Sequence, residues 1–185
     1  MAARAPRAAV LVTAVLACAA VPALAQEHAP LRAPDVMFVP TPQEVVDAML
    51  KLAGVTGNDV IYDLGSGDGR IPITAAKVYG ARGVGIDIQK SQVDSAIANA
   101  KAAGVSDKVR FLNQDLFTTN ISEATVVTLY LLPELNLKLL PKLNAELKPG
   151  TRVLSHSFDM GDAIKPKQTV RVGGRVVFLY VVPIK

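Results

Sequence analysis

The amino-acid sequence predicts an α/β fold with a doubly wound, mostly parallel sheet that ends in an antiparallel hairpin. Short apolar strands alternate with amphipathic helices between residues 41 and 155, as in a parallel sheet covered on both faces. After them, residues 169–172 and 175–182 flank Gly173-Gly174, a pattern typical of a hairpin with a two-residue turn. With 185 residues, the chain is long enough for one such domain.

The elements follow from apolar spacing and from turn signals. Thr41 as N-cap, Pro42 in the first turn and Glu44 in a capping box predict a helix that ends at Gly54. The other expected strands are residues 60–64, 83–87, 109–112, 125–131 and 151–155, and the other expected helices are residues 70–79, 90–103 and 134–147. With the hairpin, the sheet has seven strands.

Two of these helices indicate which face they bury. In the helix at 90–103, Val93, Ile97 and Ala100 recur at helical spacing and are expected to face the sheet. In the helix at 134–147, the leucines at 135, 139, 143 and 147 recur at every fourth position. Pro149-Gly150 then ends this helix before the next strand.

The first 25 residues are typical of a secretory signal peptide. Arg4 and Arg7 precede an apolar run from residue 8 to about residue 20, and Ala23-Leu24-Ala25 has the form of a cleavage site. Cleavage after Ala25 would leave residues 26–40 as an extended arm and residues 41–185 as the domain. The apolar run is short for a membrane span, which needs about 20 apolar residues. A mitochondrial transit peptide, a lipoprotein anchored at Cys18 and an uncleaved anchor are the alternatives.

Charge and cysteine content exclude several classes of protein. Without residues 1–25 the chain carries 18 basic and 16 acidic residues, which is no general footprint for nucleic acid. Its single cysteine, Cys18, lies within the expected signal peptide, so no disulfide or catalytic thiolate is expected and a periplasmic or secreted location is tolerable. No metal site is expected either, because His28 and His156 are the only histidines.

The most informative motif is the glycine loop Asp63-Leu64-Gly65-Ser66-Gly67-Asp68-Gly69, directly after a strand and before a helix. Glycines there allow a tight turn and close approach of the backbone to a ligand. A nicotinamide or flavin site has its third glycine one residue later, and an acid beside its pyrophosphate would be repelled. S-adenosylmethionine (SAM) instead carries an amino group and a sulfonium, which suit nearby acids.

Two more acids lie at the ends of the next expected strands. Asp87 closes residues 83–87, where a carboxylate can accept hydrogen bonds from both ribose hydroxyls. Asp115 follows residues 109–112 and is placed to accept the adenine amino group, with Leu116 and Phe117 beside the ring. Because the carboxyl ends of parallel strands meet at one edge of the sheet, the three acids are expected in one cleft.

These motifs resemble the SAM-binding signatures of class I, seven-stranded methyltransferases. Phe38-Val39-Pro40-Thr41-Pro42, together with the loop at residues 63–70, is similar to a subgroup of small protein-lysine methyltransferases that includes the mitochondrial enzyme acting on the c-subunit of ATP synthase. The resemblance implies that Asp63, Gly65 and Gly67 contact the methionine part of SAM and that Thr41 lies near its carboxylate. The expected cofactor-binding residues are Thr41, Asp63, Gly65, Ser66, Gly67, Asp87, Ile88, Asp115 and Leu116.

The expected acceptor side is less typical. Many amino-methylating enzymes have a (D/N)-P-P-(Y/F) motif after the fourth strand, but here residues 130–136 read Y-L-L-P-E-L-N. This departure disfavours methylation of adenine, cytosine or glutamine amides. Tyr130 and Glu134 are the candidate catalytic residues, each with a structural alternative as a strand-end aromatic or a helix N-terminal acid. His156 is either a base or a strand-end histidine.

The sequence therefore predicts a SAM-dependent methyltransferase that acts on an amine, such as a protein lysine. The expected signal peptide conflicts with this activity, since SAM is a cytosolic metabolite. Two alternatives stay open: an exported protein that binds SAM or a nucleoside without catalysis, and a small-molecule methyltransferase. The acceptor and the oligomeric state are not predicted.

Overall fold

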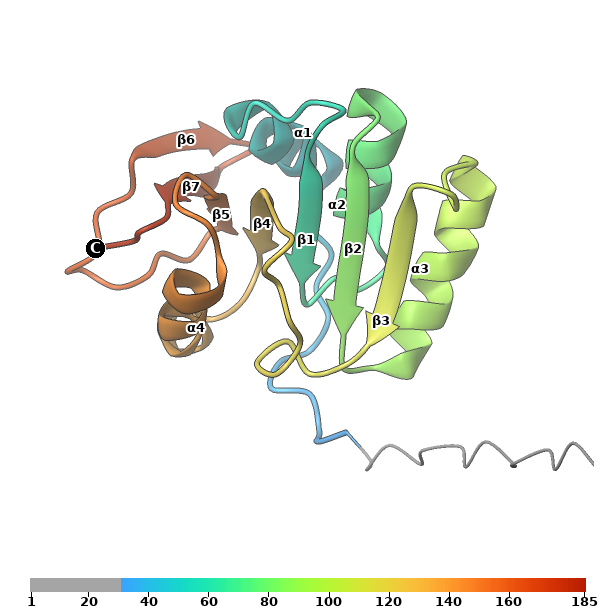
Figure 1. Cartoon of the computed structure of the whole chain (residues 1–185), viewed down its shortest axis with the longest axis horizontal. Coiled ribbons are helices and arrows are strands. Elements are labelled where there is room, and N and C mark those ends of the chain that lie inside the picture. Colours follow the sequence, from blue (N-terminus) through green and yellow to red (C-terminus); the bar gives the residue numbers. More distant parts are fainter. Residues whose placement is uncertain (1–30) are drawn as a thin grey trace, which may run out of the picture. The chain divides into compact units, whose positions relative to one another are not determined.

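A computed structural model of the chain describes residues 31–185, and these form a seven-stranded sheet in the order β3-β2-β1-β4-β5-β7-β6 (Figure 1). The expected signal peptide and the first part of the arm lie outside the described residues. The strands are β1 (Val60–Leu64), β2 (Arg82–Asp87), β3 (Val109–Asn113), β4 (Val126–Leu129), β5 (Arg152–His156), β6 (Gln168–Val172) and β7 (Arg175–Val181). The helices are α1 (Gln43–Leu52), α2 (Arg70–Thr74) with a π-helical extension η1 (Ala75–Tyr79), α3 (Lys90–Ala103) and α4 (Pro133–Glu146).

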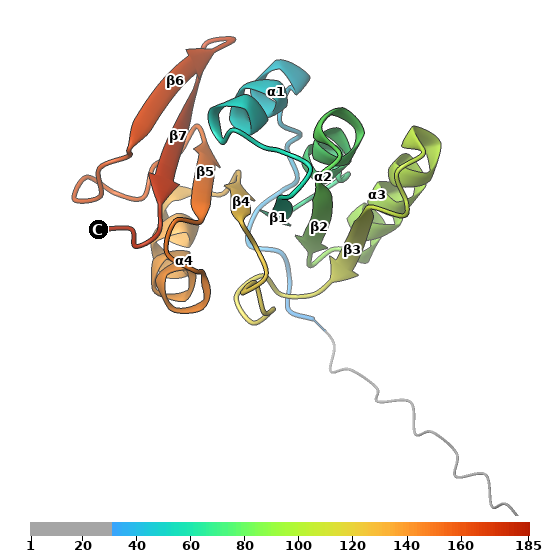
Figure 2. The same ribbon diagram turned by 45° about the horizontal axis from the view of Figure 1, so that its top comes forward.

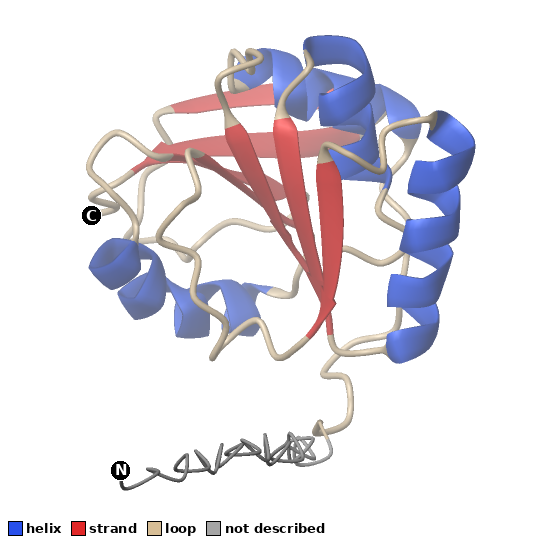
Figure 3. Ribbon diagram, turned by 45° about the vertical axis from the view of Figure 1, so that its right-hand side comes forward, coloured by secondary structure: helices blue, strands red, loops and turns tan. Residues whose placement is uncertain are grey.

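The sheet is parallel from β3 to β5 and antiparallel at β7 and β6, which confirms the predicted mostly parallel sheet with a C-terminal hairpin. Figures 2 and 3 show helices on both faces of the sheet. Neighbouring residues of one strand serve opposite faces: Ile61 packs in the core under α1, and Tyr62 packs in the core under α4. Both faces are buried, so β1 is apolar at nearly every position and its burial is continuous.

The predicted buried faces of α3 and α4 are confirmed, with one correction in α3. Leu139 and Leu143 of α4 are fully buried, as expected. In α3 the buried face consists of Val93, Ala96 and Ala100, whereas Ile97 is 51% exposed. The small Ala96 side chain lets the helix approach the sheet and the glycine loop closely, since a Cβ atom at Gly69 would lie 2.8 Å from the Ala96 Cβ.

The start of α1 also differs from the prediction. Pro42 takes the N-cap position, and no side chain caps the helix. The Thr41 hydroxyl lies 3.2 Å from His156 Nδ1, at the end of β5, so it is engaged away from the helix. The Glu44 side chain points toward the hairpin turn, where a Cβ atom at Gly173 would collide with it. Tertiary contacts therefore replace the predicted capping box.

The order of the strands creates a cleft at their carboxyl ends. From β1 the chain proceeds outward to β2 and β3, then returns to place β4 on the other side of β1. Open α/β sheets bind ligands where the strand order reverses in this way. The arm at residues 31–41 runs past the carboxyl ends of these strands (Figure 1). Within residues 31–185, no helix is long and apolar enough to cross a membrane.

Candidate active site

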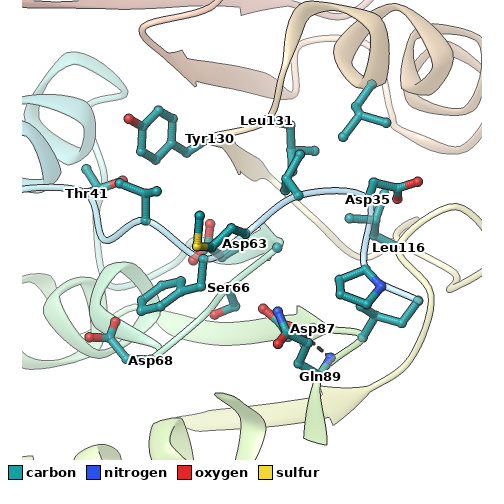
Figure 4. Close-up of a pocket in the computed structure, with 18 of the residues that line it drawn as sticks. Asp35, Thr41, Asp63, Ser66, Asp68, Asp87, Gln89, Leu116, Tyr130 and Leu131 are labelled. Atoms are coloured by element: carbon teal, nitrogen blue, oxygen red, sulfur yellow. Dashed lines mark hydrogen bonds between the residues drawn. The ribbon is translucent and has the colours of Figure 1, made fainter. Parts of the chain in front are cut away.

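The cleft is lined by the arm, the glycine loop and the residues that follow β2, β3 and β4. Figure 4 shows Thr41 and Tyr130 at one end, Asp87, Gln89 and Leu116 at the other, and Asp63 between them. Most of the expected site residues line this cleft together: Thr41, Asp63, Gly65, Ser66, Asp87, Ile88, Asp115, Leu116 and Tyr130. Gly67 lies beneath the arm, and Glu134 is exposed on the first turn of α4, outside the cleft lining.

Asp63 is the most buried acid of the cleft, with 4% of its surface exposed. Its Oδ1 accepts a hydrogen bond of 2.7 Å from the Thr128 hydroxyl on the neighbouring strand β4. Burial raises the pKa of Asp63 to about 7, and the nearby carboxylates of Asp87 and Asp68 act in the same direction, against the Thr128 hydrogen bond. Asp63 is therefore poised to become fully ionised when a cation binds beside it.

The glycine loop turns because Gly65, Gly67 and Gly69 all adopt positive φ angles, of 84°, 53° and 79°. The amides of Gly65 and Ser66 both donate to the Ile86 carbonyl, which fixes the loop to β2. At Gly67 the close approach is made by the arm: an added Cβ atom would lie 2.0 Å from the Phe38 ring. Gly67 is therefore needed both for its conformation and for the packing of Phe38.

Asp87 closes β2 and is 8% exposed. Its Oδ2 accepts a 2.8 Å hydrogen bond from the Gly67 amide, and its Oδ1 accepts a 2.9 Å hydrogen bond from the Gln89 amide. These bonds orient the carboxylate into the cleft and keep lone pairs free for a ligand. This geometry suits the ribose-binding role expected of Asp87.

Asp115 follows β3 and is paired with the arm. Its Oδ2 accepts a 2.5 Å hydrogen bond from Arg32 Nε, while Oδ1 accepts 2.9 Å and 3.2 Å hydrogen bonds from the Phe117 amide and Arg32 Nη2. The Arg32 hydrogen bonds hold the pKa of Asp115 below its usual value. Arg32 also lies 5.3 Å from the centroid of the Phe117 ring. The expected adenine-binding acid is thus in contact with a residue of the chain itself.

Arg70 joins the arm to the glycine loop. Its guanidinium donates to the Thr41 carbonyl at 2.8 Å and makes two hydrogen bonds, of 2.9 Å and 2.6 Å, to the Asp68 carboxylate. Because Arg70 begins α2, these bonds couple the helix, the loop and the arm at one point. The Thr41 hydroxyl in turn lies against His156 Nδ1, so Thr41 links the arm to the end of β5.

Tyr130, at the end of β4, packs against His156. Their ring centroids are 3.9 Å apart and the planes are tilted by 34°. His156 is completely buried, and burial together with the charge of Arg175 lowers its pKa to about 4. Such a histidine is neutral at physiological pH and too weak a base to take a proton from an amine. The structural alternative for His156 therefore fits better than a role as base.

The residues of the cleft fit SAM. Three acids, Asp63, Asp87 and Asp115, lie along it, and the Ser66 hydroxyl is buried beside Asp63. The buried Asp87 carboxylate keeps lone pairs free on the cleft side, and such buried polar groups favour a polar ligand beside them. The amino, ribose and adenine groups of SAM each require such polar contacts.

Comparison with known proteins decides the family. A family model for the ANTKMT methyltransferase domain matches residues 63–168, more than half of the chain. The chain belongs to this family. It is 45% identical over 154 residues to a protein-lysine N-methyltransferase of Saccharolobus islandicus, a match that covers 80% of this chain and 95% of the archaeal protein. It is 31% identical over 121 residues to the human lysine N-methyltransferase for the c-subunit of ATP synthase, a match that covers 65% of this chain and 51% of the human protein.

Solved structures agree with this assignment. An RNA methyltransferase from Salinibacter ruber, in complex with S-adenosyl-L-homocysteine (SAH), is 58% identical, with a TM-score of 0.76 over 78% of this chain and 94% of the other. A ribosomal protein L11 methylase from Lactobacillus delbrueckii, 19% identical with a TM-score of 0.64 over 74% of this chain and 77% of the other, shares the fold. This chain is a SAM-dependent methyltransferase, as its sequence motifs predict.

Several cleft residues are not evident from the sequence. Arg32, Met37 and Phe38 come from the arm, whose sequence shows no periodicity that would place it over the strand ends. Asp68 and Arg70 also line the cleft, where they form an ion pair. Both residues belong to the same glycine motif as Asp63, but the motif does not predict that they pair. The available signal for Phe38 is the resemblance of Phe38-Val39-Pro40-Thr41-Pro42 to the same segment of small protein-lysine methyltransferases.

Proposed function

We propose that this methyltransferase acts on the ε-amino group of lysine side chains in proteins. The observation that carries the proposal is the 45% identity to an archaeal protein-lysine N-methyltransferase over 95% of that protein's length. The geometry agrees with it. Beyond the cofactor residues, the cleft ends at the Tyr130 ring and offers no side-chain amide in the place of the (D/N)-P-P-(Y/F) motif.

Bound SAM supplies a methyl group to a nucleophile that displaces it from sulfur. The residues of the chain position the two partners and exclude water, which is the main requirement for such a displacement. Five acids and two arginines line the cleft, and this excess of acids attracts a cationic side chain toward it. The lysine must lose its proton before it reacts, and the apolar side chains of Leu131 and Leu135 that line the cleft favour the neutral amine.

RNA is the second candidate acceptor, because the protein from Salinibacter ruber is described as an RNA methyltransferase. The charges of the cleft argue against it. Five carboxylates line it, and both of its arginines are paired with aspartates. An RNA-binding cleft needs unpaired cations that contact phosphates.

The test is methyl transfer from SAM labelled in its methyl group to heat-denatured host proteins and to host RNA. We expect label that survives ribonuclease, disappears with proteinase, and is recovered as methyl-lysine after acid hydrolysis. Asp87→Ala should lose about 100-fold or more of the activity, since it removes a buried acceptor from the cofactor site. Asp94→Ala, which removes an exposed acid of α3, is the matched control. Label only in RNA, or only in small molecules, would disprove the lysine assignment.

We also propose that the chain is exported and cleaved after Ala25. The support is the basic start, the apolar run and the Ala23-Leu24-Ala25 triplet. Fractionation of the host and N-terminal sequencing should recover a periplasmic or secreted protein that begins at Gln26. A lipid on Cys18, or a mature chain with residues 1–25 intact, would contradict the proposal. An exported enzyme would need SAM outside the cytosol, so labelled SAM should be supplied to both fractions.

A further inference from the structure

Three aromatic rings lie together at the carboxyl ends of β4 and β5. Tyr130 follows β4, and His156 and Phe158 are at and after the end of β5. The Tyr130 centroid is 3.9 Å from that of His156 and 6.2 Å from that of Phe158, with ring planes tilted by 34° and 21°. Tyr130 lines the cleft, and His156 is completely buried behind it. Phe158 is half-buried beside Tyr130, next to the lining residues of the cleft. We name these three residues the aromatic wall.

The backbone bends sharply to build this wall. Ser157 has a φ of 64° and is the one residue other than glycine with a positive φ between residues 31 and 185. Its amide donates to the Val176 carbonyl at 2.7 Å, and the Phe158 amide donates to the His156 carbonyl at 2.8 Å. A left-handed serine costs roughly 1 kcal/mol or more and persists only where its surroundings require it. The bend at Ser157 brings Phe158 back toward Tyr130.

A buried asparagine holds the bend from the other side. Asn136, on α4, is fully buried, and its Nδ2 lies 3.1 Å from the Ser155 hydroxyl, 3.3 Å from the Phe158 carbonyl and 3.0 Å from the Asp159 carbonyl. The Ser155 hydroxyl donates to the same Phe158 carbonyl at 2.5 Å. Buried polar side chains with several partners fix one conformation of the loop that they bind. The backbone at Phe158 is therefore held in one conformation.

The imidazole behind Tyr130 is uncharged. His156 stays neutral at physiological pH because burial and the charge of nearby Arg175 lower its pKa, and its Nδ1 lies 3.2 Å from the Thr41 hydroxyl. Its other ring nitrogen is buried without a hydrogen-bond partner among the described residues. A neutral ring behind Tyr130 does not repel a cation that approaches the tyrosine from the cleft side.

We propose that the aromatic wall binds the acceptor lysine, with Tyr130 and Phe158 in contact with its stem and amino group and His156 as the positioning residue behind Tyr130. This inference rests on the proposed lysine activity and assigns the acceptor site within it. Flat aromatic faces pack along a methylene chain and attract an ammonium or methylammonium group. Because the wall carries no cation, it offers nothing to an anionic acceptor.

The test measures initial rates of methyl transfer to poly-L-lysine and to heat-denatured host proteins, scored as methyl-lysine. We expect Phe158→Leu to raise the acceptor concentration needed for half-maximal rate about fivefold or more, the value of one aromatic contact with a cation. The affinity for SAM, measured by calorimetry, should stay within about twofold, since a mutation outside the cofactor contacts leaves that binding energy unchanged. Phe158→Tyr should restore the wild-type acceptor dependence, and Tyr79→Leu, on η1, is the matched aromatic control.

His156 is tested by a pair of variants. His156→Phe keeps a flat ring behind Tyr130 and should keep at least about half of kcat, whereas His156→Ala leaves Tyr130 unsupported and should lose about tenfold in kcat/KM with SAM affinity unchanged. If His156→Ala does not fold, His156→Phe and Phe158→Leu still decide the question. Loss of activity in a folded His156→Phe variant would show that the imidazole itself acts and would overturn the positioning role.

The outcomes separate this inference from the proposed function. If the wild-type enzyme binds SAM but labels no lysine, the lysine activity fails and the assignment of the wall fails with it. If the wild-type enzyme labels lysine and Phe158→Leu has an unchanged acceptor dependence, only the assignment of the wall fails. A parallel loss of SAM affinity in Phe158→Leu would also overturn it, because the wall would then belong to the cofactor site.

Discussion

Asp63, Asp87 and Asp115 share one cleft but differ in their electrostatic surroundings. Asp63 is buried against Thr128 and has a pKa raised to about 7. Asp87 is held by two backbone amides, and Asp115 is paired with Arg32. The charge of Asp63 changes near neutral pH, so Asp63 links cofactor binding to pH.

The first prediction concerns this linkage. The cationic amino group of SAM favours ionised Asp63, so binding must release a proton wherever the free enzyme holds Asp63 protonated. The affinity for SAM should therefore fall as the pH drops below about 7, by up to about tenfold per pH unit. Asp63→Asn should bind SAM more weakly at pH 8 and should lose this dependence between about pH 5.5 and about pH 7.5. Calorimetry across this range, in buffers of different ionisation enthalpy, measures both effects.

The same substitution should stabilise the free protein. Because the pKa of Asp63 is higher in the folded than in the unfolded protein, protonation of Asp63 favours the folded state. This contribution to stability is complete below about pH 4 and is lost as the pH rises to about 7. Asp63→Asn avoids that loss, so its free energy of unfolding should exceed that of the wild type by up to about 4 kcal/mol at pH 8, with the gain shrinking toward pH 4. Equal pH dependence in both proteins would show that Asp63 is ionised throughout.

Glu134 gives a further prediction at the scale of single residues. It is exposed on the first turn of α4, and no side-chain hydrogen bond to it is made within the described residues. Glu134→Gln should therefore keep kcat and the acceptor dependence within about twofold, and should lose only the small stabilisation that an acid gives a helix N-terminus. A loss of kcat of about tenfold or more would return Glu134 to the catalytic candidates. Methyl-lysine formation with poly-L-lysine measures the difference.

At the scale of elements, the arm at residues 31–41 contributes much of the cleft. Phe38 packs on Gly67, Arg32 pairs with Asp115, and the Thr41 carbonyl accepts from Arg70. These contacts fasten the arm over the places expected for adenine and methionine. A cofactor that hydrogen-bonds to Asp115 must therefore share this acid with Arg32 or displace Arg32.

The third prediction follows from this competition. Arg32 is 37% exposed, and an exposed ion pair contributes about 0.2–1 kcal/mol. Arg32→Ala frees Asp115, so the dissociation constant of SAM should fall about twofold to fivefold, and the association rate measured by stopped-flow should rise. Raising the salt concentration should weaken the pair and move the wild type toward the variant. Weaker binding by Arg32→Ala would instead mean that Arg32 packs on the bound cofactor.

Across the whole molecule, the sequence is sufficient to predict the architecture. Continuous apolar strands and the helical spacing of leucines place each element on the correct face, because burial of apolar area dominates folding. The errors are local. Ile97 is exposed where periodicity predicts burial and Ala96 is buried in its place, since periodicity alone does not reveal that the sheet and the glycine loop leave room only for alanine.

The site is predictable only in part. Asp63, Asp87 and Asp115 can be predicted because each lies at or just after the carboxyl end of a strand, and these ends meet at one edge of a parallel sheet. The partners of Thr41 cannot be, because its contact with His156 joins positions 115 residues apart in the chain. The same holds for Arg32 and Asp115, which are 83 residues apart. Such contacts depend on the path of an irregular arm, and no periodic pattern encodes that path.

The last prediction concerns the molecule as one folding unit. The cleft is built by residues from the arm to the first turn of α4, so a ligand there should stabilise the whole described domain. At about 100 times its dissociation constant, SAH should add about 2.7 kcal/mol to the free energy of unfolding and raise Tm by roughly 5–10 °C. Hydrogen exchange should slow at residues 31–41 and in the glycine loop together. Asp87→Ala should show almost no shift and Asp94→Ala the full shift. Protection confined to the glycine loop would mean that the arm stays open over the bound ligand.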